Sequence, residues 1–193
     1  MKVAVTGGIG SGKSLVCSIL EKIGVPVFYA DDVSKMLINN SPEIKRSLTA
    51  LFGTDIYLEN GTIHRKKLAN IIFNDNIALQ KVNSIIHPEV RKAFDVWAEQ
   101  QTSAPYVVQE AAILFESGLI SHFDKIILVT APLELKIERV MKRDSITREL
   151  VLERMKNQLP DKVKIEHSDF RIENDGRKMI LSQILKIHEK LIE

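Results

Sequence analysis

The sequence has a single cysteine, almost no net charge and no long apolar run, and each scarcity excludes a class of protein. Cys17 is alone among 193 residues, so no disulfide forms within the chain, and its place near an apolar helical stripe predicts a small buried hydrophobe. Lys and Arg total 27 against 25 Asp and Glu, which gives no basic field for nucleic acid. No apolar run has the length of a membrane span. We expect a cytoplasmic protein without nucleic-acid or membrane partners, and a monomer that self-associates weakly at most.

The most informative segment is a glycine-rich loop between an apolar run and a helical pattern. Residues 7–14 read GGIGSGKS and match G-x-x-x-x-G-K-[ST], with Gly7 and Gly12 as the fixed glycines. The run Val3–Val5 before it predicts a buried strand, and the apolar spacing after it predicts a helix. Strand, glycine-rich loop and helix in this order indicate a binding site for the phosphates of a nucleoside triphosphate. We call residues 7–14 the phosphate loop.

Each residue type in the phosphate loop has a chemical reason. Glycines let the backbone bend tightly and point successive N–H groups at phosphate oxygens. Lys13 supplies a mobile positive charge near the β- and γ-phosphates, and the Ser14 hydroxyl can hold Mg²⁺. The helix N-terminus that follows favours an anion. The predicted nucleotide contacts of the loop are Gly8, Gly10, Ser11, Gly12, Lys13 and Ser14.

Further apolar segments predict strands along the rest of the chain. They are Pro26–Tyr29, Tyr106–Val108 with its neighbours, Lys125–Thr130 and Phe170–Ile172. Helical patterns separate them, which favours right-handed crossovers and a parallel sheet. We therefore predict an α/β protein with the P-loop NTPase fold, a parallel five-stranded sheet flanked by helices. Ligands bind at the carboxyl ends of such strands, here at Thr6, Ala30, Glu110 and Thr130.

One domain, residues 1–193, accounts for the length. Its core is expected at 1–40, 103–140 and 160–193. Between them, residues of about 41–102 form helices without a clear strand, longer than a crossover needs, and we predict a helical substrate-binding insertion there. The apolar stripe of its longest helix is Ile77, Val82, Ile85, Ile86, Val90, Phe94 and Trp97. Residues of about 141–159 are rich in charge, with few candidates for burial, and are predicted to be a mobile lid over the nucleotide.

Acidic residues stand at two of the predicted strand ends. Asp31 could orient an acceptor hydroxyl or take its proton during transfer, or it could cap the helix that follows. Glu110 could be a second-shell partner of Mg²⁺, or it could form a structural salt bridge. The spacing alone does not decide between these alternatives.

Polar residues in the second half of the chain also have two interpretations each. Arg139 and Arg143 are four residues apart and share a helical face, which suits phosphate contacts or stacking on a base, or a solvated surface. Asn174 opens an Asn-Asp-Gly turn signal and could contact the adenine edge.

His64 and His87 lie in the predicted insertion, and no cluster of residues in the sequence has the spacing of metal ligands.

Taken together, these segments resemble the dephospho-CoA kinase family. The matching pieces are TGGIGSGKS at 6–14, Ala30-Asp31, FG at 52–53, NGTIHR at 60–65, HPEV at 87–90, ILFE at 113–116, Arg139 with Arg143, Gln158, and SDF with Asn174-Asp-Gly at 168–176. They follow the family's order over nearly the whole chain. The resemblance implies transfer of a phosphoryl group from ATP to the ribose 3′-hydroxyl of dephospho-CoA, with Mg²⁺. It also implies a nucleotide core, a helical CoA-binding part and a mobile lid.

The resemblance also assigns roles by position. Asp31 would be the acid beside the 3′-hydroxyl, and Lys13, Arg139 and Arg143 would act on the phosphates, with Lys13 and Arg143 catalytic. Asn174 would approach the adenine. The substrate contacts would be Asp31, Arg65, His87 and Glu116, and Mg²⁺ would be held by Ser14, with Glu110 in its second shell.

The chain departs from the family pattern at several positions. Tyr29 stands where Asp is common, and Leu15, in place of a usual Thr, offers only its backbone N–H to phosphate. Other departures are His64 for Asp, Ala112 for Pro and Lys136 for Gln.

Other functions share parts of this pattern. Another nucleoside or nucleotide kinase of the P-loop class would have the same core and a different acceptor. A GTP-dependent switch usually carries Asn-Lys-x-Asp after a later strand, whereas Thr130-Ala-Pro-Leu follows here. A nucleotide-binding scaffold without turnover would not need the combination of Lys13, Ser14 and Asp31.

Overall fold

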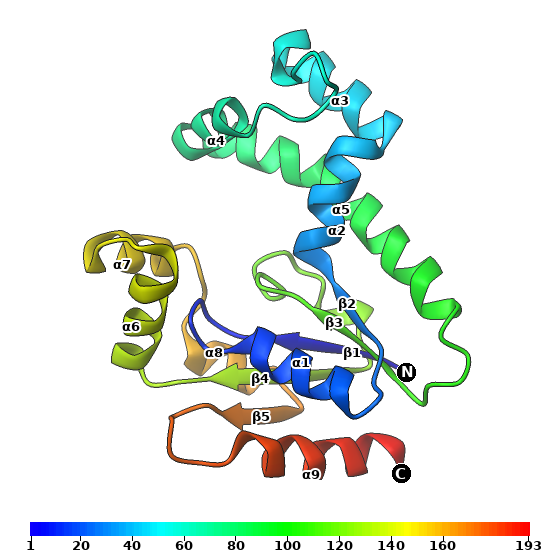
Figure 1. Ribbon diagram of the computed structural model, residues 1–193, viewed down its shortest axis with the longest axis vertical. Helices are drawn as coiled ribbons and strands as arrows, with labels where there is room; N and C mark the ends of the chain where they lie inside the picture. The colour runs from blue at the N-terminus through cyan, green and yellow to red at the C-terminus, as the bar shows by residue number, and fades with distance from the viewer. The chain divides into compact units, whose positions relative to one another are not determined.

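The computed structural model describes residues 1–193, apart from the side chain of Asn74, and divides them into two compact units. Unit 1 comprises Met1–Tyr29 and Gln100–Glu193, and unit 2 comprises Ala30–Glu99. The elements of unit 1 are β1 (Lys2–Thr6), α1 (Lys13–Lys22), β2 (Val27–Tyr29), β3 (Val107–Glu110), η2 (Ile120–His122), β4 (Lys125–Thr130), α6 (Leu133–Asp144), α7 (Arg148–Lys156), α8 (Asp161–Glu166), β5 (Phe170–Glu173) and α9 (Ile180–Ile192) (Figure 1). Those of unit 2 are α2 (Ala30–Asn40), α3 (Pro42–Phe52), η1 (Thr54–Ile56), α4 (Arg65–Asn74) and α5 (Asn76–Glu99).

The described strands of unit 1 form one parallel five-stranded sheet in the order β2-β3-β1-β4-β5. This confirms the α/β class and the predicted strands within one or two residues. In the register, Val5 lies beside Glu110 on β3 and Thr6 beside Leu128 on β4. The phosphate loop therefore leaves the sheet at its central strand, next to the carboxyl end of β3.

One face of the sheet is covered by α1 and α9, which lie side by side in Figure 1. Alternate residues of a strand point to opposite faces, and Val3 and Val5 of β1 point to this one. Both are fully buried, with Val16 and Leu20 of α1 and Ile184 of α9 in the same cluster. Cys17 belongs to this cluster as well, so its prediction as a buried hydrophobe is confirmed.

The opposite face is covered mainly by the segment that follows β3. Ala4, on the other side of β1, packs with Leu114 and Phe115 of this segment and with Leu128 of β4. The helix α8 contacts β4. Within the ILFE segment, residues 113–116, Leu114 and Phe115 therefore pack against the sheet, whereas Ile113 is exposed.

Unit 2 consists of helices that pack around α5. The helices α2, α3 and α4 all contact α5, and Val82, Ile86 and Phe94 of its predicted stripe are buried. Ile77 is an exception, 65% exposed, because it lies five residues from Val82 and hence about 140° around the helix. The expectation that it belongs to the stripe was wrong.

The helix α2 groups with unit 2, whereas the sequence had placed residues 1–40 together in the core. It contacts α3 and α5. The functions proposed for the helical insertion and for the lid remain predictions.

The proposed lid, residues 141–159, contains the end of α6, all of α7 and the turn after it. Val151 of α7 is fully buried against Ile137 and Val140 of α6. The sequence had suggested few candidates for burial in this segment, and α6 with α7 instead forms a small apolar cluster. Among the residues described, no helix combines the length and apolarity that crossing a membrane requires.

Candidate active site

The phosphate loop adopts backbone conformations that only glycine takes without strain. Gly10 and Gly12 have φ angles of 78° and 98°, in the region that L side chains rarely occupy. A Cβ atom on Gly12 would lie 2.1 Å from Nδ2 of Asn174, and one on Gly10 would lie 2.4 Å from the carbonyl oxygen of Lys136. Both positions therefore require glycine for conformation and for space.

The loop passes into α1 at Lys13, where the helix offers its N-terminus. The N–H groups of Leu15 and Val16 donate to the carbonyl of Gly12 at 3.1 and 3.2 Å. The Lys13 ammonium donates to the carbonyl of Gly7 at 2.9 Å and of Gly8 at 3.4 Å. The lysine thus lies over its own loop, in the position from which an ammonium can reach bound phosphates.

A hydroxyl and a carboxylate meet beside the loop. Ser14 Oγ donates a hydrogen bond of 2.9 Å to Oε1 of Glu110, which ends the strand next to β1. Such oxygen ligands suit Mg²⁺, which usually takes one or two protein groups together with substrate phosphates and waters. Its binding would not need a larger cluster, and none of three or more His, Cys, Asp or Glu is found in the described part of the chain. The Ser14–Glu110 pair therefore fits the predicted Mg²⁺ site. Glu110 accepts its hydrogen bond from Ser14, the residue predicted to hold the ion.

Asn174 supports the phosphate loop from behind. Its side chain is 4% exposed, its Nδ2 donates to the Ser11 carbonyl at 2.8 Å, and its Oδ1 accepts from Arg139 Nη2 at 3.0 Å. Arg139 Nη1 donates to the carbonyl of Gly10 at 3.4 Å. Both polar atoms of the Asn174 amide are therefore engaged inside unit 1, one with the phosphate loop and one with Arg139.

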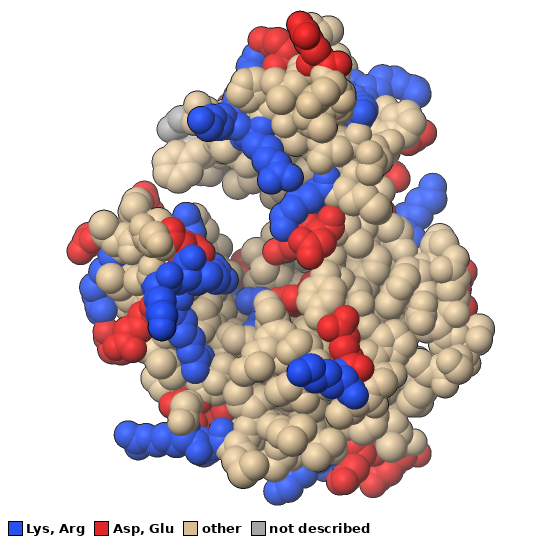
Figure 2. Space-filling model, viewed as in Figure 1, with Lys and Arg blue, Asp and Glu red and all other residues tan. Residues whose placement is uncertain are grey.

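Arg143 has different partners from Arg139, although one helical turn separates them. Its Nε and Nη2 donate to the carboxylate of Asp144 at 2.7 and 3.1 Å. Arg154 Nη1 donates to the same carboxylate at 2.7 Å, and the two guanidiniums, Arg143 foremost, lower the pKa of Asp144. Figure 2 shows basic and acidic side chains interspersed over α6 and α7. Arg139 therefore contacts the phosphate loop directly, whereas Arg143 is exposed in the segment proposed as the lid.

Glu116 forms contacts that the sequence did not indicate. Its Oε1 accepts from the N–H of Leu159 at 2.8 Å and lies 2.8 Å from Nζ of Lys164, which is fully buried. Burial by itself would raise the pKa of Glu116, but the ammonium and the N–H together lower it. The carboxylate is thus charged and joins the segment under the sheet to the end of the lid.

Asp31 lies in the first turn of α2 and is exposed. The helix begins at Ala30, so Asp31 is within it rather than at the N-cap position before it. Its neighbour Asp32 pairs with Lys35 at 2.7 Å and is the largest cause of the raised pKa of Lys35; Asp31 raises this pKa as well, and Arg65 lowers it. Asp31 and Arg65 therefore lie within electrostatic range of the same lysine.

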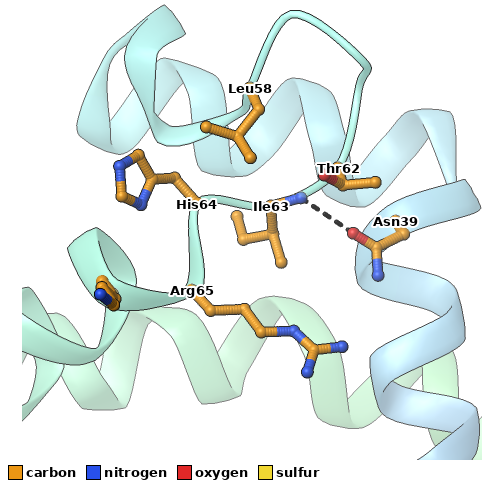
Figure 3. A pocket seen from close by; sticks show the side chains of 7 residues that line it. Asn39, Leu58, Thr62, Ile63, His64 and Arg65 are labelled. Carbon is orange, nitrogen blue, oxygen red and sulfur yellow. Dashed lines mark hydrogen bonds between the residues drawn. The ribbon is translucent and has the colours of Figure 1, made fainter.

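Unit 2 also contains a cavity of about 430 Å³. Its lining residues are Asn39, Leu58, Thr62, Ile63, His64, Arg65 and Lys66. The backbone N–H of Ile63 donates to Asn39 Oδ1 at 2.9 Å, and the side chain of Arg65 extends toward the helix that carries Asn39 (Figure 3). His64 caps α4 by accepting from the N–H of Lys67 at 3.3 Å. The cavity thus combines apolar walls with exposed cationic groups.

His87, the remaining predicted substrate contact, lies on α5. It is half-buried, and this burial lowers its pKa, which favours the neutral ring at pH 7. Of the predicted site residues, unit 1 brings together the phosphate loop, Glu110, Arg139 and Asn174, whereas Asp31, Arg65 and His87 belong to unit 2.

Comparisons with known proteins agree on one family. The family model described as dephospho-CoA kinase matches residues 1–179. Dephospho-CoA kinases of Bacteroides fragilis and Porphyromonas gingivalis are 38% and 39% identical to this chain, each over 97% of it and over 91% and 92% of their own length. A crystal structure from Thermus thermophilus superposes with a TM-score of 0.88 at 32% identity, covering 100% of this chain and 98% of the other.

Proposed function

We propose that this chain, which belongs to the dephospho-CoA kinase family, transfers the γ-phosphoryl group of ATP to the ribose 3′-hydroxyl of dephospho-CoA. The products are coenzyme A and ADP, and the reaction is the last step of coenzyme A synthesis. The observation that carries the chemistry is the phosphate loop with Lys13 over it and the Ser14–Glu110 pair beside it.

The phosphate loop holds the donor. Backbone N–H groups of the loop and of the first turn of α1 bind phosphate oxygens, with the contacts assigned above to Gly8, Gly10, Ser11 and Gly12. The N–H of Leu15 joins them by leaving its 3.1 Å bond to the carbonyl of Gly12. The Lys13 ammonium exchanges its two carbonyl partners for phosphate oxygens and stabilises the charge that develops during transfer. Glycine at positions 10 and 12 lets the backbone come this close.

We assign Mg²⁺ to the hydroxyl of Ser14, with Glu110 accepting a hydrogen bond in the second shell. When bound, the ion neutralises charge on the β- and γ-phosphates. Glu110 orients the hydroxyl that would hold it, since the 2.9 Å bond fixes the rotamer of Ser14. The hydroxyl oxygen keeps its lone pairs for the ion because it is the donor in this bond.

Asp31 acts on the acceptor. The 3′-oxygen attacks the γ-phosphorus, the bond from phosphorus to the bridging β,γ-oxygen breaks, and ADP leaves. The carboxylate of Asp31 orients the 3′-hydroxyl and receives its proton as the new bond forms. An exposed carboxylate in the first turn of a helix is accessible to such a substrate.

Unit 2 binds the rest of the acceptor. We assign Arg65 to the anionic pyrophosphate of dephospho-CoA, because an exposed guanidinium offers bidentate contacts to phosphate and lies at the rim of an apolar cavity. His87, neutral on α5, supplies a polar contact. Glu116, in unit 1, has Oε1 in the ion pair with Lys164 and Oε2 buried without a hydrogen-bond partner among the described residues, so its assigned contact with the acceptor requires Oε2 to be uncovered.

Arg139 and Arg143 complete the nucleotide site from the lid side, and Asn174 contributes near the adenine. Arg143 leaves Asp144 for the transferring phosphoryl group when the lid closes. We place the enzyme in the cytoplasm as a monomer with at most weak self-association.

An ATP-consumption assay with a panel of acceptors tests the proposal. Dephospho-CoA is compared with nucleosides and nucleoside monophosphates at equal concentration, with ATP and GTP as donors. We expect turnover with ATP and dephospho-CoA to exceed every other combination. Preference for another acceptor would replace the proposed substrate, and preference for GTP without an acceptor would indicate a switch protein.

A further inference from the structure

One hydrogen bond joins the phosphate loop to the far end of the lid. The N–H of Ile9, in the loop, donates to Oε1 of Gln158 at 2.8 Å, across 149 residues of sequence. Gln158 comes two residues after the end of α7, in the turn before α8, and is half-buried. Its Nε2 lies 3.5 Å from the carbonyl of Ala112 in the segment under the sheet. None of the roles proposed above uses this residue.

The peptide between Gly8 and Ile9 is surrounded by polar side chains from the same region. A Cβ atom on Gly8 would lie 3.5 Å from Lys136 Nζ, 3.5 Å from Asp161 Oδ1 and 3.7 Å from Gln158 Oε1. Lys136 and Asp161 form an ion pair of 2.7 Å, with Lys136 11% exposed. Gln158 thus accepts the hydrogen bond from the Ile9 N–H, and the Lys136–Asp161 ion pair lies beside it.

The backbone of Gln158 is held in place by the next residue. The N–H of Leu159 donates to Glu116, whose carboxylate pairs with the buried Lys164. A buried ion pair of this kind is costly to open. The backbone of Gln158 is therefore fixed before its side chain forms the hydrogen bond to the loop. This preorganisation lowers the conformational entropy that the bond costs.

We propose that Gln158 is a positioning residue that fixes the Gly8–Ile9 peptide of the phosphate loop and joins it to the C-terminal end of the lid. The Oε1 acceptor holds the N–H of Ile9, so the following N–H groups of the loop keep their orientation toward the transferring phosphates. Because Gln158 ends the lid segment, the position of the lid and the geometry of the loop are connected by this bond. The inference rests on the proposed role of the loop in binding ATP.

The test compares three variants by amide exchange and kinetics. Gln158→Leu removes the acceptor, Gln158→Glu keeps it, and Asn157→Leu makes the same apolar change at the exposed neighbouring position. In Gln158→Leu we expect exchange of the Ile9 amide, followed by NMR without ligand, to accelerate about three- to tenfold, the loss of one hydrogen bond. Gln158→Glu should stay within about twofold of wild type, since its carboxylate still accepts the bond.

The kinetic readout separates positioning from general stability. For Gln158→Leu we expect kcat to fall about three- to tenfold, while the KM for dephospho-CoA and the melting temperature stay as in Asn157→Leu. Unchanged exchange of the Ile9 amide, or a loss of kcat that Asn157→Leu reproduces, would overturn the proposal. If the melting temperature of Gln158→Leu falls below that of Asn157→Leu, the same measurements of Ile9 exchange and kcat are made on Gln158→Ala, with the same expected results.

The two proposals can fail separately. If the wild-type chain does not phosphorylate dephospho-CoA, the proposed function fails, and the positioning role is then read from Ile9 exchange and from ATP affinity measured by calorimetry. Gln158→Leu should weaken ATP binding about three- to tenfold. Equal ATP affinity together with unchanged Ile9 exchange refutes the positioning role whatever the acceptor is.

Discussion

Replacing Lys164 by Met should destabilise the protein more than any surface substitution in unit 1. Lys164 is fully buried, and its ammonium lies 2.8 Å from a carboxylate oxygen of Glu116, whose side chain is 17% exposed. Methionine fills a similar volume but leaves the carboxylate without its cation. The N–H of Leu159 remains as a partner, so the carboxylate is not fully orphaned.

The magnitude follows from this geometry. Removing one partner of a buried ion pair costs about 3–5 kcal/mol, and the partial exposure of Glu116 with its remaining N–H donor places the expected loss near the lower end, about 3 kcal/mol. For a chain of this size, each kcal/mol lowers the melting temperature by about 2–4 °C, so the variant should melt about 6–12 °C earlier.

The effect should depend on pH with a definite sign. The pKa of Glu116 is lowered in the folded protein, so its contribution is present above the unfolded pKa of about 4.3. It is lost as pH falls through the lower folded pKa, because the carboxylate must then take up a proton. The stability difference between wild type and Lys164→Met should therefore shrink as the pH falls below the unfolded pKa and through the lower folded one.

Urea unfolding of the ligand-free protein at pH 7 and at acidic pH measures both effects. Lys162→Met, at an exposed position of the same helix, serves as the control and should stay within about 0.5 kcal/mol of wild type. A double-mutant cycle with Glu116→Gln isolates the pair. A coupling energy below about 0.5 kcal/mol, or a loss for Lys164→Met no larger than the control's, would refute the reasoning.

Three further predictions concern the chemistry. Asp31→Asn should lower kcat by roughly 10²–10⁴-fold, with little change in the KM for ATP. Asp32 forms an exposed ion pair with Lys35, so Asp32→Asn should lower kcat by no more than about tenfold. Steady-state kinetics that show the larger loss of kcat at Asp32 would reverse the assignment. Ser14→Ala should raise the Mg²⁺ concentration for half-maximal turnover about tenfold, and an unchanged Mg²⁺ titration would remove Ser14 as a ligand. Residues 144–159 should exchange amide hydrogens more slowly with ATP and acceptor bound, and equal protection in both states would end the lid hypothesis.

The sheet and the phosphate loop could be predicted because their signals are local. The apolar run Val3–Val5, the glycine spacing of residues 7–12 and the helix from Lys13 are consecutive in sequence, and each limits the conformation of the next. Apolar runs likewise marked β4 and β5 to within one residue. Topology placed Glu110 at the same edge of the sheet as the phosphate loop, since parallel neighbours end at the same edge, but the sequence left its role open between a second-shell partner of Mg²⁺ and a structural salt bridge.

The supports of the loop could not be predicted, because they join residues far apart in the chain. Asn174 reaches Ser11 across 163 residues, whereas its local sequence indicated a turn and a contact to the adenine edge. Gln158 and Lys164 stand in a polar, charged stretch whose composition resembles a solvated surface. Their partners are determined by how α8 and the segment after β3 pack on the sheet, and no periodic pattern in the sequence records that packing.

For a related reason, the sequence does not show whether the helix α2 belongs to unit 1 or to unit 2. The helix α2 carries its apolar residues with the same spacing whether it packs on a sheet or on other helices, and it contacts α3 and α5. Val151 shows the converse, because it is buried against α6 although it lies in a charged segment, and Leu152 and Met155 of α7 pack against the same cluster.

The most direct test of the central claim is the identity of the product. The chain is incubated with Mg²⁺, ATP and dephospho-CoA, the acceptor product is analysed by mass spectrometry, and ³¹P NMR locates the added phosphate; Lys13→Ala is the inactive control. The account predicts a product heavier by one phosphate, carried on the ribose 3′-oxygen, and no product with the variant. A phosphate at another position, an unmodified acceptor with wild type, or equal turnover by Lys13→Ala would contradict it.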